Sequence, residues 1–105
     1  MKRILWSEKE DEICCKTVVD EYVIGRKDTY IEDCITDIKS NKDIAERDRG
    51  SIRMRFQNIK ELLEEMGVPN TLSIKPLANA AKQTRRILMS YLENAGYLKS
   101  SEGKE

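Results

Sequence analysis

The chain has 105 residues, of which 39% are hydrophobic and 36% are charged, and its 19 basic residues balance its 19 acidic residues. This length predicts a single domain, and no run of residues approaches the ~20 apolar residues that a membrane-spanning helix needs. Because the net charge is zero, overall charge gives no argument for binding to DNA, RNA or a membrane.

The chain contains three cysteines, Cys14, Cys15 and Cys34, and no histidine. An odd number of cysteines with two of them adjacent is a poor disulfide framework, and no C-x-x-C spacing indicates a zinc site. We interpret the three as packing residues in a reducing compartment. The start of the sequence lacks the long apolar stretch of a secretory signal. We therefore expect a cytoplasmic protein with no metal and no cofactor.

Charge is distributed unevenly along the chain. Acids outnumber bases between Glu8 and Asp37, whereas bases dominate between Arg47 and Lys60 and again between Lys75 and Arg86. A neutral protein with segregated charge can still present one basic face.

Glycines and prolines divide the chain into four predicted helices. The first covers residues 7–23, because Ser7 and Glu10 form a capping-box pattern and Gly25 follows the last turn. Its apolar stripe is Cys14, Val18 and Tyr22. The second covers residues 28–40, with Asp28 or Thr29 as its cap. Its apolar stripe is Tyr30, Ile31, Cys34, Ile35 and Ile38.

The third predicted helix covers residues 51–66 and has the clearest pattern. Ser51 is its expected N-cap, and Gly67 is its expected C-terminal glycine. Its apolar positions recur in steps of four and three: Ile52, Phe56, Ile59, Leu63 and Met66. A turn-rich linker leads to the fourth helix at residues 77–94, before Gly96. Its expected core stripe is Leu77, Ala81, Leu88 and Leu92.

The sequence offers no recognisable catalytic group. Without histidine the usual general base at neutral pH is absent, and no glycine-rich phosphate loop occurs. The carboxylates of residues 8–12 lie at a predicted helix start, where the helix dipole already explains them. We therefore expect a non-catalytic protein with no small-molecule substrate.

The third helix is the candidate nucleic-acid-binding element, because an α-helix fits the DNA major groove and Arg, Gln and Asn can read base edges there. Arg53 and Gln57 are the expected base readers, and Arg47 and Arg49 the expected phosphate contacts. The full candidate set is Arg47, Arg49, Ser51, Arg53, Arg55, Gln57 and Lys60, joined by Lys82, Arg85 and Arg86 if they lie on the same side. The alternative is an ordinary solvated face with minor ion pairs.

Two motifs resemble known helical domains. Residues 6–11, Trp-Ser-Glu-Lys-Glu-Asp, resemble the opening of Myb/SANT-type domains, and residues 49–59 resemble their closing helix. Residues 51–59 and Gly67-Val68 are also similar to a small helical module of bacterial and phage proteins that often precedes HNH-type nuclease domains. The resemblance implies that Trp6, Phe56 and Ile59 are core residues and that Asn58 bonds to backbone rather than DNA.

The resemblance implies an all-α fold with a three-helix, helix-turn-helix-type bundle at residues 1–67. The linker and an additional C-terminal helix at 68–98 would pack on the same domain, and 99–105 would be a disordered tail.

The leading hypothesis is a DNA-binding domain of bacterial, phage or mobile-element origin. It requires Arg53 and Arg55 to face solvent, and ion pairs under the acidic first helix would contradict it. The alternative is a protein-binding adaptor or regulator that acts on a host protein complex or a separate nuclease. Zero net charge and the acidic first two helices favour this alternative.

Overall fold

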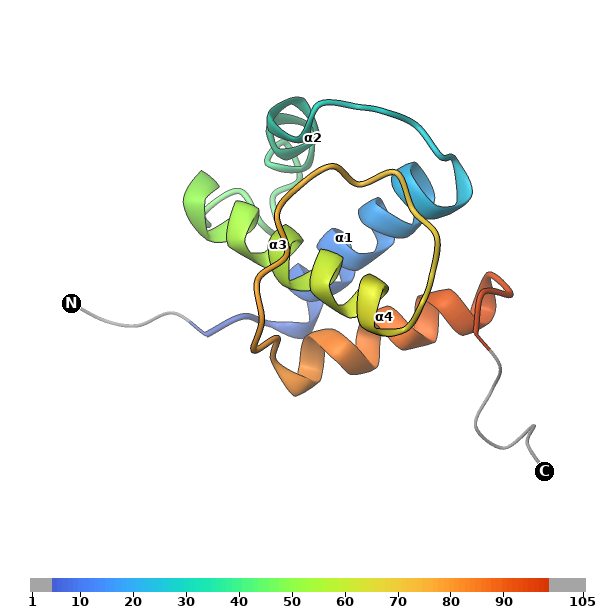
Figure 1. The fold of residues 1–105 in the computed structure, drawn as a ribbon. Helices are drawn as coiled ribbons and strands as arrows, with labels where there is room; N and C mark the ends of the chain where they lie inside the picture. The colour runs from blue at the N-terminus through green and yellow to red at the C-terminus, as the bar shows by residue number, and fades with distance from the viewer. Residues whose placement is uncertain (1–4, 99–105) are drawn as a thin grey trace.

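A computed structural model of the protein describes residues 5–98, and within this range the chain is helical and contains no strand. The elements are α1 (Glu8–Val18), its π-helical continuation η1 (Val19–Ile24), α2 (Ile31–Ile38), α3 (Arg49–Glu65) and α4 (Lys82–Asn94) (Figure 1). The all-helical prediction is confirmed for these residues, while the Myb/SANT arrangement stays a prediction. The predicted tail at 99–105 lies outside the described residues. No helix within 5–98 combines the length and apolar character needed to cross a membrane.

The first helix begins and ends where the sequence predicts. Ser7 and Glu10 form the capping box: the Glu10 N–H donates to Ser7 Oγ at 3.1 Å, and the Ser7 N–H donates to Glu10 Oε1 at 3.0 Å. The last turn widens into η1 and ends at Gly25. A Cβ at Gly25 would lie 2.7 Å from the Asp20 carbonyl oxygen, so this turn has no room for a side chain.

The second helix is shorter than predicted, and neither of its expected caps begins it. Tyr30 is the N-cap residue and makes no side-chain capping bond, so the prediction of Asp28 or Thr29 was wrong. The Thr29 carbonyl instead accepts a hydrogen bond from the Tyr22 hydroxyl at 2.9 Å. This bond ties the segment before α2 to η1.

The third helix begins two residues earlier than predicted. Asp48 is its N-cap, and Asp48 Oδ1 accepts a hydrogen bond from the Ser51 N–H at 2.8 Å, so Ser51 lies inside the first turn. The C-terminus follows the prediction. Gly67 has a φ of +70°, and the N–H groups of Gly67 and Val68 donate to carbonyls of the last turn. This Schellman pattern requires a left-handed residue, which glycine adopts most easily.

The fourth helix begins at Lys82 rather than near Leu77, because the preceding residues bond to α3. The Leu77 N–H donates to the Gln57 carbonyl at 3.1 Å, and Asn58 Nδ2 donates to the Leu77 carbonyl at 2.7 Å. The expected backbone role of Asn58 is therefore confirmed. Leu77 and Ala81 were wrongly assigned to the core, since both are exposed.

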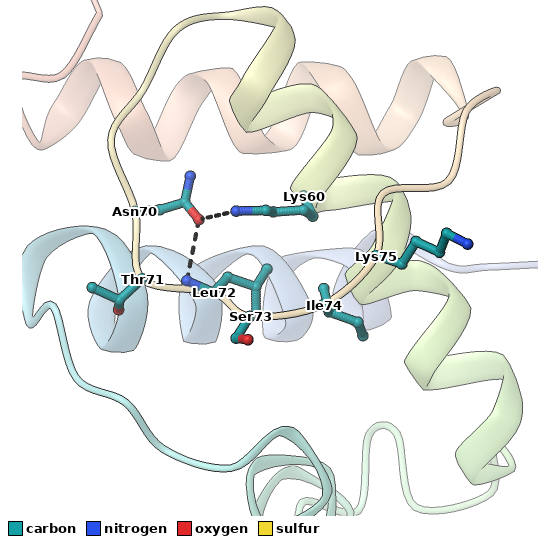
Figure 2. Close-up of a pocket in the computed structure, with 7 residues that line it drawn as sticks. All are labelled: Lys60, Asn70, Thr71, Leu72, Ser73, Ile74 and Lys75. Atoms are coloured by element: carbon teal, nitrogen blue, oxygen red, sulfur yellow. Dashed lines mark hydrogen bonds between the residues drawn. The ribbon is translucent and has the colours of Figure 1, made fainter.

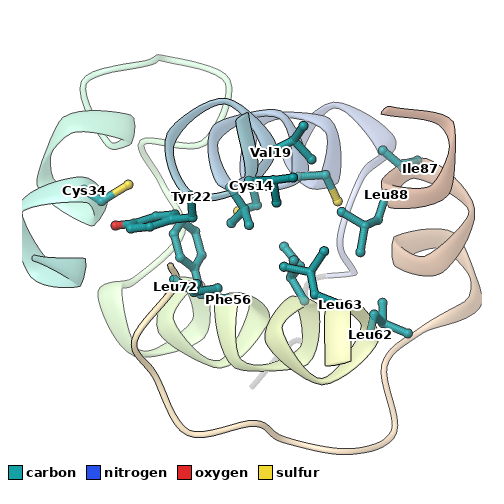
Figure 3. Close-up of a cluster of buried hydrophobic side chains, with 14 of the residues drawn as sticks. Cys14, Val19, Tyr22, Cys34, Phe56, Leu62, Leu63, Leu72, Ile87 and Leu88 are labelled. Carbon is teal, nitrogen blue, oxygen red and sulfur yellow. The ribbon is translucent and has the colours of Figure 1, made fainter. Parts of the chain in front are cut away.

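All the helices contribute to one hydrophobic core, and α4 packs against both α1 and α3. Figure 3 shows side chains from every element converging, including Tyr22, Phe56 and Leu88. Phe56 and Ile59 are fully buried as expected, while Trp6 packs at the core's edge. The three cysteines are buried packing residues, as predicted: Cys14, Cys15 and Cys34.

Candidate functional site

The arginines of the predicted DNA-binding set are engaged within the molecule. Each forms an ion pair, as does Lys60, with N–O distances between 2.6 and 3.3 Å. The pairs are Arg47–Glu10, Arg49–Glu32, Arg53–Glu32, Arg55–Asp11, Lys60–Glu64, Arg85–Glu65 and Arg86–Glu8. Apart from Lys60–Glu64, which lies within α3, these pairs join different parts of the chain before any partner is considered.

Arg55 does not face solvent, contrary to what the DNA-binding hypothesis requires of it. Its side chain is only 9% exposed and pairs with Asp11 of α1, whose side chain is fully buried. Arg55 Nη1 also donates to Thr84 Oγ1 of α4 at 2.5 Å. Arg55 Nε lies 3.2 Å from Asp11 Oδ1 but lacks the alignment of a hydrogen bond, so this contact is a charge interaction. Three helices meet at this buried pair.

The Arg47 side chain is also covered, and its expected contact with phosphate stays a prediction. Its side chain is 8% exposed, and its guanidinium lies 4.2 Å from the centre of the Trp6 ring. The Arg55 guanidinium lies 4.3 Å from the same ring. Gln83 of α4 donates to the Trp6 carbonyl at 3.0 Å and fixes this segment from the other side. Burial alone would raise the pKa of Glu10. The hydrogen bonds from Arg47 and the Ser7 backbone outweigh this effect, so the pKa of Glu10 lies below its usual value.

Arg49 and Arg53 share one carboxylate, that of Glu32 in α2. The N–O distances are 2.9 Å for Arg49 and 2.6 Å for Arg53, and each arginine side chain remains 41% exposed. The hydrogen bonds from Arg49 and Arg53 lower the pKa of Glu32. These two arginines lie at the α2–α3 contact, and one of their two positive charges is neutralised there.

One side of α3 faces away from the core, and we call it the crest. It carries no cation. At 100° per residue, the positions opposite Ile52 and Ile59 are Met54, Gln57 and Glu61. Met54 is 55% exposed, and Gln57 and Glu61 are partly exposed. Ser51, the remaining α3 candidate, is also partly exposed.

The linker between α3 and α4 also crosses this side of α3. Figure 1 shows the linker passing across α3. Leu77 and Ala78 lie there against Gln57 and Asn58, and Asn58 Nδ2 bonds to both linker carbonyls, at 2.7 and 3.4 Å. The middle of α3 is therefore partly covered by the chain itself. A major groove could not receive the whole helix while the linker occupies this position.

Two of the candidate cations on α4 pair with carboxylates at the ends of two other helices. Arg85 pairs with Glu65 at the end of α3 and lowers the pKa of that carboxyl, while Arg86 pairs with Glu8 at the start of α1. Lys82 is exposed and has no ion-pair partner within residues 5–98. The ion pairs give no indication that these cations join Arg49 and Arg53 in one patch.

Lys60 points under the linker rather than away from the molecule. Its Nζ donates to Asn70 Oδ1 at 3.0 Å, and the same oxygen accepts the Leu72 N–H at 3.1 Å (Figure 2). A hollow of about 570 Å³ opens between Lys60 and linker residues 70–75. Glu64 Oε2 lies 3.3 Å from Lys60 Nζ, so the lysine's charge is matched within its own helix.

An acidic groove between η1 and α2 was not identified from the sequence. It has a volume of about 400 Å³ and is lined by Thr17, Asp20, Glu21, Thr29, Asp33, Cys34, Asp37 and Ile38. Its carboxylates come from two elements that are separate in sequence. The excess of acids between residues 8 and 37 and the i,i+4 spacing of Asp33 and Asp37 were the signals that could have located it.

The groove has more carboxylates than neighbouring cations. Asp20 pairs with Lys16 at 2.8 Å, and Glu21 lies 3.6 Å from Lys27. Asp33 and Asp37 have no ion-pair partner within the part of the chain that the structure describes. On α2, Glu32 faces the arginines of α3, whereas Asp33 and Asp37 face the groove.

The groove does not carry an activated nucleophile. Burial raises the pKa of the Cys34 thiol, so it stays protonated at neutral pH. Among residues 5–98 there is no group of three or more His, Cys, Asp or Glu side chains placed to hold a metal ion. The groove therefore offers carboxylate and hydroxyl acceptors above an apolar floor of Cys34 and Ile38.

No known protein family, curated protein or solved structure matches the chain. The resemblance to Myb/SANT-type domains rests on the two sequence motifs alone.

Proposed function

We propose that this protein is a non-catalytic adaptor that binds a basic segment of a partner protein in the groove between η1 and α2. The observation that supports this proposal most is the convergence of Asp20, Glu21, Asp33 and Asp37 on one groove. Two of these carboxylates, Asp33 and Asp37, have no cationic partner within residues 5–98. Lysine and arginine are the side chains that complement such a surface.

The groove also suits the shape of basic side chains. Lys and Arg place aliphatic stems on apolar surface while their charged ends reach polar groups. Cys34 and Ile38 provide the apolar floor, and Thr17 and Thr29 add hydroxyl acceptors at the sides. Exposed ion pairs contribute only about 0.2–1 kcal/mol each, so binding should need several contacts and weaken as salt increases.

DNA binding through α3 is the competing proposal, because Arg49 and Arg53 keep part of their side chains exposed. It is less well supported. Arg47 and Arg55 are buried, and the linker crosses the middle of α3. Phosphate would also be repelled by the carboxylates on the neighbouring η1–α2 side.

The test is a titration of the full chain against two fluorescent probes, an arginine-rich peptide and a DNA duplex, with anisotropy as the readout. We expect the peptide to bind with an affinity that falls as salt increases. The double variant Asp33→Asn/Asp37→Asn should weaken peptide binding about tenfold, the equivalent of ~1.4 kcal/mol for two exposed pairs.

The matched control is Asp43→Asn/Glu46→Gln, which removes two exposed carboxylates outside the groove. Its peptide affinity should equal that of the unmodified chain. Equal weakening in both double variants, or no peptide binding at low salt, contradicts the adaptor proposal. Duplex binding that is lost in Arg49→Ala/Arg53→Ala would instead support the α3 proposal.

A further inference from the structure

The linker contains a segment that is held much less firmly than its two ends. We call residues 75–79 the strap. Before it, Val68 and Leu72 are buried at 4% and 2% exposure, and the Thr71 N–H donates to the Tyr22 carbonyl at 2.8 Å. After it, α4 begins at Lys82 and packs on the core. Every residue of the strap itself is exposed.

The strap is fastened to α3 by a few hydrogen bonds. The Leu77 N–H donates to the Gln57 carbonyl at 3.1 Å, and Asn58 Nδ2 donates to the Leu77 carbonyl at 2.7 Å, with a longer contact to Ala78. Leu77 is 36% exposed and so adds a partial apolar contact, but within residues 5–98 no ion pair and no fully buried side chain adds to these bonds. Solvent-exposed hydrogen bonds without apolar burial characterise the segments of a protein that open most easily.

The closed strap also includes an unfavourable backbone conformation. Asn79 has a φ of +71°, in the left-handed region. Asparagine tolerates this region better than most residues, but only glycine adopts it without a steric cost. Release of the strap would let Asn79 leave this conformation, so the backbone itself favours opening.

We propose that the strap is a latch that opens and closes over α3 while the helices stay folded. In the open state the Gln57 carbonyl and the Asn58 amide lose their strap partners, and the part of α3 around Gln57 and Asn58 becomes accessible in addition to the already exposed Met54. None of the residues that fasten the strap lines the acidic groove, so the latch is independent of the adaptor proposal. The exposed area of α3 therefore differs between the open and closed states of the latch.

Hydrogen exchange measured by NMR on the full chain tests the latch. The Leu77 amide reports the strap, and the Ile59 and Leu63 amides in the buried part of α3 report global unfolding. We expect the Leu77 amide to exchange at least about a hundredfold faster than the other two. Asn58→Ala should accelerate it about fivefold further, because one net hydrogen bond is lost, and should accelerate Leu63, which reports global unfolding of the same native state, by no more than that factor.

Position 79 provides a second, independent test that does not touch α3. The Leu77 amide should exchange about fivefold more slowly in Asn79→Gly than in Asn79→Ala, because only glycine accepts the left-handed φ without strain. Asn94→Ala, an exposed substitution in α4, is the control and should leave the Leu77 amide unaffected. Exchange of Leu77 at the rate of Ile59, or equal rates in the two position-79 variants, would overturn the proposal.

Discussion

At the scale of single residues, the Asp11–Arg55 pair is the least tolerant point of the molecule. Asp11 is fully buried and also accepts hydrogen bonds from Gln83 and Thr84. Replacing only Arg55 by Met should destabilise the protein by about 3–5 kcal/mol, because a buried carboxylate loses its counter-charge. Urea unfolding monitored by circular dichroism measures this loss.

The matched variant is Asp11→Asn/Arg55→Met, which removes both charges. It should be more stable than Arg55→Met alone, since no uncompensated charge remains buried. A double variant as unstable as the single one would mean that packing, rather than charge, accounts for the loss.

The sequence could not indicate that Arg55 is buried, because its partner lies in another helix. The stripe that includes Ile52, Phe56 and Ile59 places the core side of α3 correctly, but Arg55 lies at the edge of that stripe. Whether such a flank faces water depends on where another helix packs. Here Thr84 of α4 and Asp11 of α1 both contact the Arg55 side chain.

At the scale of the elements, η1 depends on the absence of a side chain at Gly25. Its φ is an ordinary −73°, so alanine would meet no backbone strain. The added Cβ would instead lie 2.7 Å from the Asp20 carbonyl and 3.1 Å from the Glu21 carbonyl. Gly25→Ala should therefore destabilise the protein by about 1–3 kcal/mol, the usual cost of forcing extra atoms into a packed site.

Gly50→Ala serves as the comparison in the same thermal melting experiment. It lies inside α3, and the only neighbour of the added Cβ would be Asp48 Oδ1 at 4.0 Å. Alanine is favoured over glycine in a helix by about 0.5–1 kcal/mol, so this variant should melt higher. Equal melting temperatures for the two variants would show that the close contacts of Gly25 are unimportant.

Two helix ends with local signals were predicted correctly, whereas the local cap of α3 at Asp48 was missed and ends set by distant partners were not predictable. The capping box of Ser7 and the left-handed Gly67 depend only on adjacent residues, and both occur as predicted. The start of α4 depends on bonds from Gln57 and Asn58 to Leu77, which no periodicity reveals. The acidic groove was missed for the same reason, since it forms only when η1 and α2 are brought together.

At the scale of the whole molecule, α4 is part of the core rather than an addition to a finished bundle. Ile87, Leu88 and Leu92 are buried with side chains of α1 and α3. A shortened chain that ends at Val68 should therefore lose most of its helical circular dichroism signal and its cooperative thermal transition. A sharp transition in that fragment would show that residues 1–67 fold alone, as the resemblance to Myb/SANT-type domains implies.

The hydrogen bond from Gln83 to the Trp6 carbonyl joins residues that are 77 positions apart. During synthesis on the ribosome, the segment with Trp6 emerges first, and its partner Gln83 is added 77 residues later. The contact of Trp6 with α4 can therefore form only after α4 has been synthesised.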